Sequence, residues 1–183
     1  MSRQPSRRTS TRALARISRQ VTALRSPPTC LPFGKTLEVR DGCLCLFVQR
    51  AARALARRFD NAFRAVGLTH GQFSLLMALN RPDPPVIGEV AALLGMDRTT
   101  LTAALKALVR RGLVEVRADE EDRRSRRLIL TPAGGALLAA AYPVWKSAHG
   151  AIEAILAAPE RLRADLADLA RDAERGTSPR DIK

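Results

Sequence analysis

The sequence predicts a mainly α-helical fold with one small β-hairpin, and three observations support this prediction. The composition is rich in Ala, Leu and Arg and only 4% aromatic, which favours helix over strand. Residues 86–111 have the pattern of a helix, a glycine turn and a second helix. Residues 113–130 have the pattern of two short strands around an arginine-rich loop. Together these elements have the layout of a winged helix-turn-helix.

Residues 1–34 are predicted to form a basic, disordered tail. The first forty residues contain nine Lys or Arg and a single acid, Glu38, in a chain of 183 residues with a net charge of +13. Proline breakers at residues 27, 28 and 32 close this segment. Because so large a positive charge favours a polyanion as partner, one hypothesis is a non-specific nucleic-acid-binding protein that uses this tail.

Two helices are expected after the tail. Apolar residues at three- and four-residue spacing predict a helix over residues 41–66, with Asp41 as its N-cap and Gly67 as its C-terminal stop. Thr69 is expected to cap a second helix that runs through Asn80. A proline-rich run then ends this helix and forms a loop.

The helix-turn-helix motif follows this loop. A short helix is expected over residues 86–94, and Gly95 makes the turn. Asp97 is expected to cap the next helix, which runs to about Arg111. Gly112 then ends that helix as the left-handed residue preferred there.

The remaining predicted elements are two strands and two helices, at residues 113–117, 126–130, 131–157 and 159–175. Pro132 stands at the first position of the longer helix, where its missing N–H costs nothing. Pro143 lies inside the same helix and predicts a bend.

The second helix of the motif is the candidate reading head. Its leucines face inward, so helical spacing turns a polar row outward. The major groove of DNA admits one helix, and small side chains near its start let the backbone approach the bases. Arg98 is placed to pair with guanine, whereas Lys106 and Arg110 are better placed for phosphate. The predicted DNA-binding residues of this helix are Arg98, Thr99, Thr100, Thr102, Lys106 and Arg110.

The loop between the two strands is a second candidate contact. Arginine suits the strong negative potential of the minor groove. Asp122 is placed to pair with Arg124 and so to stiffen the loop tip, whereas the acids at 119–121 are expected to oppose DNA affinity. The predicted DNA-binding residues of the loop are Arg123, Arg124 and Arg126.

Three segments carry a resemblance to the MarR family of bacterial transcriptional regulators. They are GLTHGQFSLLMAL (67–79), IGEVAALLGMDRTTLTAALKALVRRGLV (87–114) and the pattern Asp122-x-Arg124-x5-Leu130-Thr131. The similarity runs from about residue 41 to residue 170. It implies a homodimer whose first and last helices interdigitate. Each subunit would offer one recognition helix and one wing to a pseudo-palindromic operator in double-stranded DNA, and a small ligand or an oxidant would relieve repression.

This resemblance also implies a domain organisation. Residues 35–175 would form one domain, with a DNA-binding lobe over 67–131 and dimerisation helices over 41–66 and 132–175. Residues 176–183 are expected to be a polar C-terminal tail. The expected location is the bacterial cytoplasm, in association with the nucleoid.

Cys43 and Cys45 suggest an alternative mechanism by which repression could be relieved. In the organic-hydroperoxide-sensing branch of the family, a reactive cysteine lies at this place, with tyrosines four and fourteen residues later. Cys45 is similar in position, but Gln49 and Phe59 occupy the two tyrosine positions. The alternative function is a thiol-based redox-sensing regulator that acts through Cys43 and Cys45. The simpler interpretation is that both cysteines are small buried hydrophobic residues with no redox role.

Aromatic residues on the first and the long helix are candidates for an effector pocket. The resemblance places effectors, often aromatic acids or phenols, between the dimer helices and the DNA-reading lobe. The candidate pocket residues are Phe47, Phe59, Phe63, Tyr142 and Trp145. Packing in the hydrophobic core is the other interpretation of the same residues.

Other classes of protein find little support in the sequence. Two isolated histidines, with no nucleophile motif and no phosphate-cradling glycine loop, predict no enzyme and no cofactor. The cysteines and histidines lack the paired spacing of a zinc site. No apolar stretch approaches the ~20 residues that span a bilayer, so no membrane partner is expected. A regulator that acts through a protein partner, without a functional helix-turn-helix, remains a rival hypothesis.

Overall fold

The computed structural model describes residues 30–119, 122 and 124–176, and these fall into two compact units that divide between Gln49 and Arg50. In the first unit, α2 (Phe33–Gly42) precedes the start of α3 (Leu44–Phe63). The prediction of a single helix from Asp41 was therefore wrong. Asp41 lies inside α2, where its carboxylate pairs with Arg40 at 2.6 Å. Periodicity gave no signal for α2 because this helix has no buried residue and no apolar stripe.

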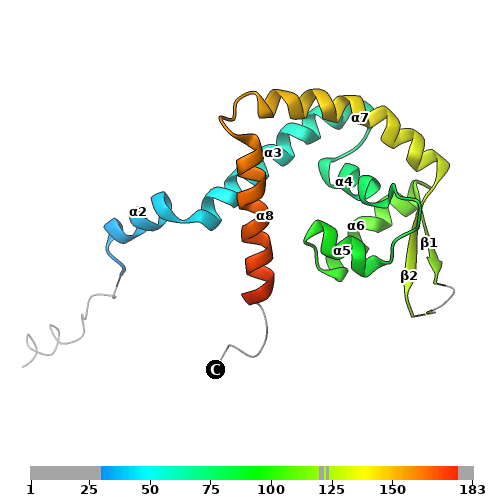
Figure 1. Ribbon diagram of the computed structural model, residues 1–183, viewed down its shortest axis with the longest axis horizontal. Coiled ribbons are helices and arrows are strands. Elements are labelled where there is room, and N and C mark those ends of the chain that lie inside the picture. The colour runs from blue at the N-terminus through cyan, green and yellow to red at the C-terminus, as the bar shows by residue number, and fades with distance from the viewer. Residues whose placement is uncertain (1–29, 120–121, 123, 177–183) are drawn as a thin grey trace, which may run out of the picture. The chain divides into compact units, whose positions relative to one another are not determined.

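In the second unit, α3 ends in a 3-10 turn (Arg64–Val66), and three short helices and a hairpin follow it (Figure 1). Gly67 follows this turn in the left-handed conformation, with φ of 65°, and so acts as the predicted C-terminal stop. Thr69 caps α4 (His70–Leu79) in a full capping box, because Gln72 returns a hydrogen bond to the Thr69 N–H.

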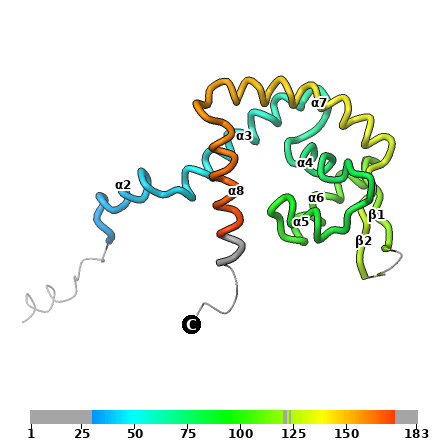
Figure 2. Tube along the Cα trace, viewed as in Figure 1, coloured from blue at the N-terminus to red at the C-terminus, as the bar shows by residue number. Residues whose placement is uncertain are grey.

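The helix-turn-helix consists of α5 (Ile87–Leu94) and α6 (Arg98–Arg110), as the sequence predicts. Gly95 makes the turn with φ of 60°, a conformation that disfavours a side chain. The tube view in Figure 2 shows α4, α5 and α6 gathered beside the hairpin strands.

The wing is a two-stranded antiparallel sheet of β1 (Val114–Ala118) and β2 (Arg126–Leu130). Its register pairs Val114 with Leu130 and Ala118 with Arg126. The first strand therefore lies one residue later than predicted, because Leu113 is used to close α6, its N–H donating to the carbonyl of Leu108. The predicted mainly α fold with a small β-wing is confirmed.

Two long helices complete the chain. In α7 (Pro132–Glu153), the Thr131 side chain accepts from the N–H of Gly134, and Pro132 stands at the helix start as predicted. This helix ends four residues before the predicted Ala157, and α8 (Pro159–Gly176) follows. In the described parts of the chain, no helix has the length and apolarity needed to cross a membrane.

The core of the second unit lies where α3, α4, α6, β2 and α7 meet. Its largest fully buried side chains include Phe63 of α3, Leu76 of α4, Leu101 of α6 and Leu128 of β2. The hairpin thus packs on the same core as the helix-turn-helix, so the wing and α6 have a defined relation to each other.

Candidate nucleic-acid interface

Helix α6 begins with a cap that fixes its first turn. The carboxylate of Asp97 accepts hydrogen bonds from the hydroxyl of Thr100 at 2.6 Å and from its N–H at 2.8 Å. The hydrogen bond from the Thr100 hydroxyl, and to a lesser extent the one from its N–H, holds the pKa of Asp97 below its ordinary value. The hydroxyl of Thr102 donates to the carbonyl of Arg98 at 2.7 Å. Two of the three predicted DNA-binding threonines therefore use their hydroxyl protons within the helix, whereas Thr99 is exposed.

The predicted outward row of α6 is on the surface. Leu101, Leu105 and Leu108 are buried, which turns Thr102, Lys106 and Arg110 to the exposed side. A shallow groove of about 650 Å³ runs between this row and the wing. Its lining includes Thr102, Lys106, Arg110, Val116 of β1 and Arg126 of β2. The reading helix and the wing thus share one surface, in which three basic side chains lie among mostly apolar lining residues.

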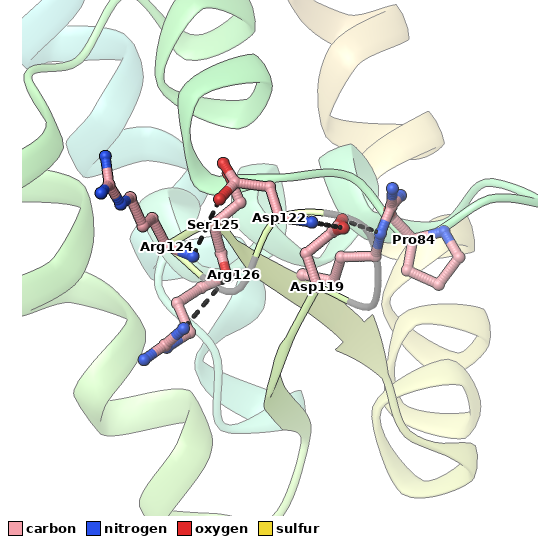
Figure 3. Close-up of polar contacts among 7 residues, drawn as sticks. Pro84, Asp119, Asp122, Arg124, Ser125 and Arg126 are labelled. Atoms are coloured by element: carbon pink, nitrogen blue, oxygen red, sulfur yellow. Dashed lines mark hydrogen bonds and ion pairs between the residues drawn. The ribbon is translucent and has the colours of Figure 1, made fainter.

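The loop tip of the wing is organised by Asp122. One of its carboxylate oxygens accepts from the N–H of Arg124 at 3.0 Å, and the other accepts from the Ser125 hydroxyl at 3.1 Å. Asp122 therefore holds the backbone of Arg124, in place of the predicted pairing with its guanidinium. In Figure 3, the side chains of Arg124 and Arg126 extend toward one side of the hairpin, away from Asp119. Arg123 lies outside the described residues.

A second acid anchors the base of the loop. Asp119 is only 3% exposed, and its carboxylate lies 2.5 Å from Nε of Arg127. It also accepts from the N–H of Asp122 at 2.9 Å. Arg127 in turn donates to the carbonyl of Pro84, in the loop before α5. The expectation that Asp119 opposes DNA affinity is corrected by this geometry, because its charge is paired inside the wing.

Sequence reasoning missed this anchor and a similar one on α6. Arg111 donates to the carbonyl of Gly67 at 3.0 Å and so ties the end of α6 to the start of α4. The sequence indicated these two anchors only through their positions at the ends of elements, since Asp119 directly follows a strand and Arg111 ends a helix.

A mostly apolar cavity of about 540 Å³ lies between α4, α5 and α7. Two of the predicted pocket residues, Tyr142 and Trp145, line it, together with Phe73 and Met77. The rings of Tyr142 and Trp145 stack, with their centroids 5.8 Å apart. The other predicted pocket residues lie elsewhere: Phe59 and Phe63 are buried in the core, and Phe47 is an exposed residue of the first unit.

The two candidate cysteines differ in exposure. Cys43 is half-buried between α2 and α3, whereas Cys45 is exposed and its sulfur accepts a hydrogen bond from the Gln49 amide at 3.1 Å. Within residues 30–119, 122 and 124–176, no group of three His, Cys, Asp or Glu side chains is placed to hold a metal ion.

Comparisons with known proteins agree with this geometry. The MarR family model matches residues 66–125. The crystal structure of the M. tuberculosis transcriptional regulator MosR in complex with DNA is 38% identical and covers 74% of this chain and 99% of its own, with a TM-score of 0.70. The structure of the transcriptional repressor CouR on a 23-mer DNA duplex is 32% identical and covers 79% of this chain and 99% of its own, with a TM-score of 0.61.

A curated relative, the transcriptional activatory protein BadR of Rhodopseudomonas palustris, is 36% identical over 88 residues. This match covers 46% of the present chain and 50% of the relative, so it spans half of that protein's length.

The fold and this basic surface define a winged helix-turn-helix protein. The similarity to MosR over 99% of that chain then gives the family: the chain belongs to the MarR family.

Proposed function

We propose that this protein is a sequence-specific, homodimeric DNA-binding regulator, and that it represses transcription until a small ligand releases it. The observation that carries this proposal is the shared groove, which is lined by Lys106 and Arg110 of α6 and by Arg126 of the wing. A helix in the major groove and an arginine-bearing wing at the adjacent minor groove would meet a duplex together.

The test is binding of the full chain to the DNA that flanks its own gene, compared with a scrambled duplex, over a salt series. We expect a preference for the native fragment at every salt concentration and a steep loss of affinity as salt rises. A variant that lacks residues 1–29 serves as the control. Equal binding of the two duplexes that disappears in this variant would favour the non-specific, tail-driven alternative.

The dimer is proposed from an uncovered apolar stripe on α8. Leu162, Leu166 and Leu169 follow one another at helical spacing and are 41–47% exposed, and no described side chain of α8 is buried. An apolar stripe of this kind normally packs against another helix. We propose that the helix that packs against this stripe belongs to a second copy of the chain. Light scattering should give twice the mass of one chain, and Leu166→Asp should reduce it; a monomeric wild type would contradict the dimer.

A small aromatic effector is proposed for the cavity beside Trp145. Its volume of about 540 Å³ is in the range of about 300–1,000 Å³ typical of small-molecule sites. Trp145 is the single tryptophan of the chain, so its fluorescence reports directly on this cavity. Titration with salicylate should change this fluorescence and weaken DNA binding. Because relatives are named both as repressor and as activatory protein, a reporter gene under the native promoter tests the sign of regulation.

The thiol alternative is supported by the exposure of Cys45. A hydroperoxide would oxidise its thiolate to a sulfenate and would itself be reduced to the alcohol. Loss of DNA binding on treatment with cumene hydroperoxide, abolished by Cys45→Ser but not by an effector-cavity variant such as Trp145→Phe, would favour this mechanism. Unchanged DNA binding after the same treatment would contradict it.

A further inference from the structure

A small cationic cavity lies between the first turn of α5, the start of α6 and the wing tip. Its volume is about 250 Å³, below the range of about 300–1,000 Å³ that accommodates drug-sized ligands. Three of its lining residues are arginines and none is acidic. The full lining is Val86, Ile87, Gly88, Arg98, Thr102, Arg124, Ser125 and Arg126.

The guanidinium of Arg98 lies against α5. A Cβ placed on Gly88 would be only 3.2 Å from Nη2 of Arg98 and 3.9 Å from its Cζ and Nε. The guanidinium therefore packs over the first turn of α5, and the absence of a side chain at Gly88 makes the room for it. Within the described residues, the structure gives neither this guanidinium nor that of Arg124 a hydrogen-bond acceptor or an ion-pair partner.

The first turn of α5 adds further positive potential to the cavity. Its N-cap is Val86, which has no side chain able to accept a hydrogen bond from the first N–H groups. The positive end of the helix dipole favours an anion, and the acid of this turn, Glu89, forms an ion pair with Arg81 at 3.7 Å and does not line the cavity. Arginine binds a phosphate through two parallel N–H groups, so two arginines that line one small cavity suit a phosphate oxygen cluster.

We propose that this cavity binds one backbone phosphate of the DNA duplex, with Arg98 and Arg124 as its ligands and Gly88 as the residue that positions Arg98. The inference rests on the proposed DNA-binding function. It replaces the expectations that Arg98 pairs with guanine and that Arg124 enters the minor groove, because Arg98 packs over the first turn of α5 and both side chains line this cavity. Gly88 then contributes to affinity without contacting DNA through a side chain.

Gly88→Ala tests this proposal with little risk to folding. Alanine is the better helix former, and the atom it meets is the mobile end of an arginine side chain, so the melting temperature should not fall. Gly71→Ala is the matched control, since Gly71 occupies the same position in the first turn of α4 and its added Cβ would meet nothing within 4 Å. Fluorescence anisotropy of the full-length proteins, on the native and the scrambled duplex over a KCl series, gives the affinities.

A phosphate contact has a distinct signature in this assay. In Gly88→Ala and in Arg98→Ala, the affinity for the native duplex and the affinity for the scrambled duplex should fall by the same factor. This factor is about tenfold, as expected for loss of one charged hydrogen-bonding group. Arg98→Ala should also lower the salt slope by about one. The double variant should bind no more weakly than Arg98→Ala alone, because Gly88 acts through Arg98.

Three results would overturn the proposal. If Gly88→Ala binds DNA with wild-type affinity, Gly88 does not position Arg98. The same conclusion follows if the losses of affinity in the two single variants add in the double variant. A loss in Arg98→Ala confined to the native duplex would make Arg98 a base-reading residue. In each of these cases the wild type still binds DNA, so the proposed function stands. A wild type that binds neither duplex would instead refute the proposed function and this inference together.

Discussion

Gly134 of α7 packs tightly against the residues that flank the wing, and replacing it with alanine should destabilise the protein. An added Cβ would lie 2.2 Å from the backbone carbonyl oxygen of Leu113 and 2.8 Å from Cδ1 of Leu130. The leucine side chain has room to rotate, but the carbonyl belongs to the start of the hairpin. The same carbonyl accepts the N–H of Thr131 at 3.1 Å, so moving it also weakens that hydrogen bond.

The expected magnitude follows from these contacts. Overpacking at a fixed backbone costs about 1–3 kcal/mol, and the weakened hydrogen bond costs about 1 kcal/mol. The better helix propensity of alanine returns about 0.5–1 kcal/mol. The free energy of unfolding should therefore fall by about 1–3.5 kcal/mol, which lowers the melting temperature of a chain of this size by about 2–14 °C.

Urea unfolding followed by circular dichroism measures this change, and Gly135→Ala is the control. Gly135 is the next residue of the same helix, and a Cβ there would meet nothing within 4 Å. Its replacement should raise stability by about 0.5–1 kcal/mol. If the two variants have the same unfolding midpoint, the packing of α7 against Leu113 described here is wrong.

Three further predictions concern the wing and the reading helix. Asp119→Asn should lower the free energy of unfolding by about 1–3 kcal/mol, because it removes a charged, buried hydrogen-bond acceptor from Arg127; an unchanged urea midpoint would contradict the anchor. Arg124→Ala should weaken DNA binding about tenfold by loss of a charged contact, with the mass in light scattering unchanged; full operator affinity in this variant would refute the role of the wing. Asp97→Ala should lower the melting temperature at neutral pH. Since the folded-state pKa of Asp97 is depressed by Thr100, its stabilisation is complete above the ordinary carboxyl pKa of 3.8 and is lost as the pH falls through the lowered value; a difference in melting temperature that persists in strong acid would rule out this linkage.

Local signals in the sequence were sufficient for most of the second unit. Caps and glycine stops act over a few residues, so the positions of Thr69, Asp97, Gly95 and Pro132 could be assigned from residue type alone, and the structure confirms each one. The apolar stripe of α6 likewise indicated which of its faces is exposed, because its leucines recur at helical spacing.

Features that depend on contacts between distant segments were not available from the sequence. The pairing of Asp119 with Arg127, and of Arg127 with Pro84, joins residues up to 43 positions apart. The same limitation applies to Phe59 and Phe63, whose spacing fits a pocket wall and a core equally well until the packing of α3 is known. Helix α2 was missed for a different reason, since it buries no residue and so leaves no periodic pattern.

The most direct test of the central claim is the affinity of the full chain for the DNA that flanks its own gene, relative to a scrambled duplex, measured across a salt series together with Lys106→Ala. We expect tighter binding to the native fragment at every salt concentration, and weaker binding in the variant, because Lys106 lies on the exposed row of α6. Equal affinity for the two duplexes, or full affinity in Lys106→Ala, would contradict the assignment of α6 and the wing as a sequence-reading surface.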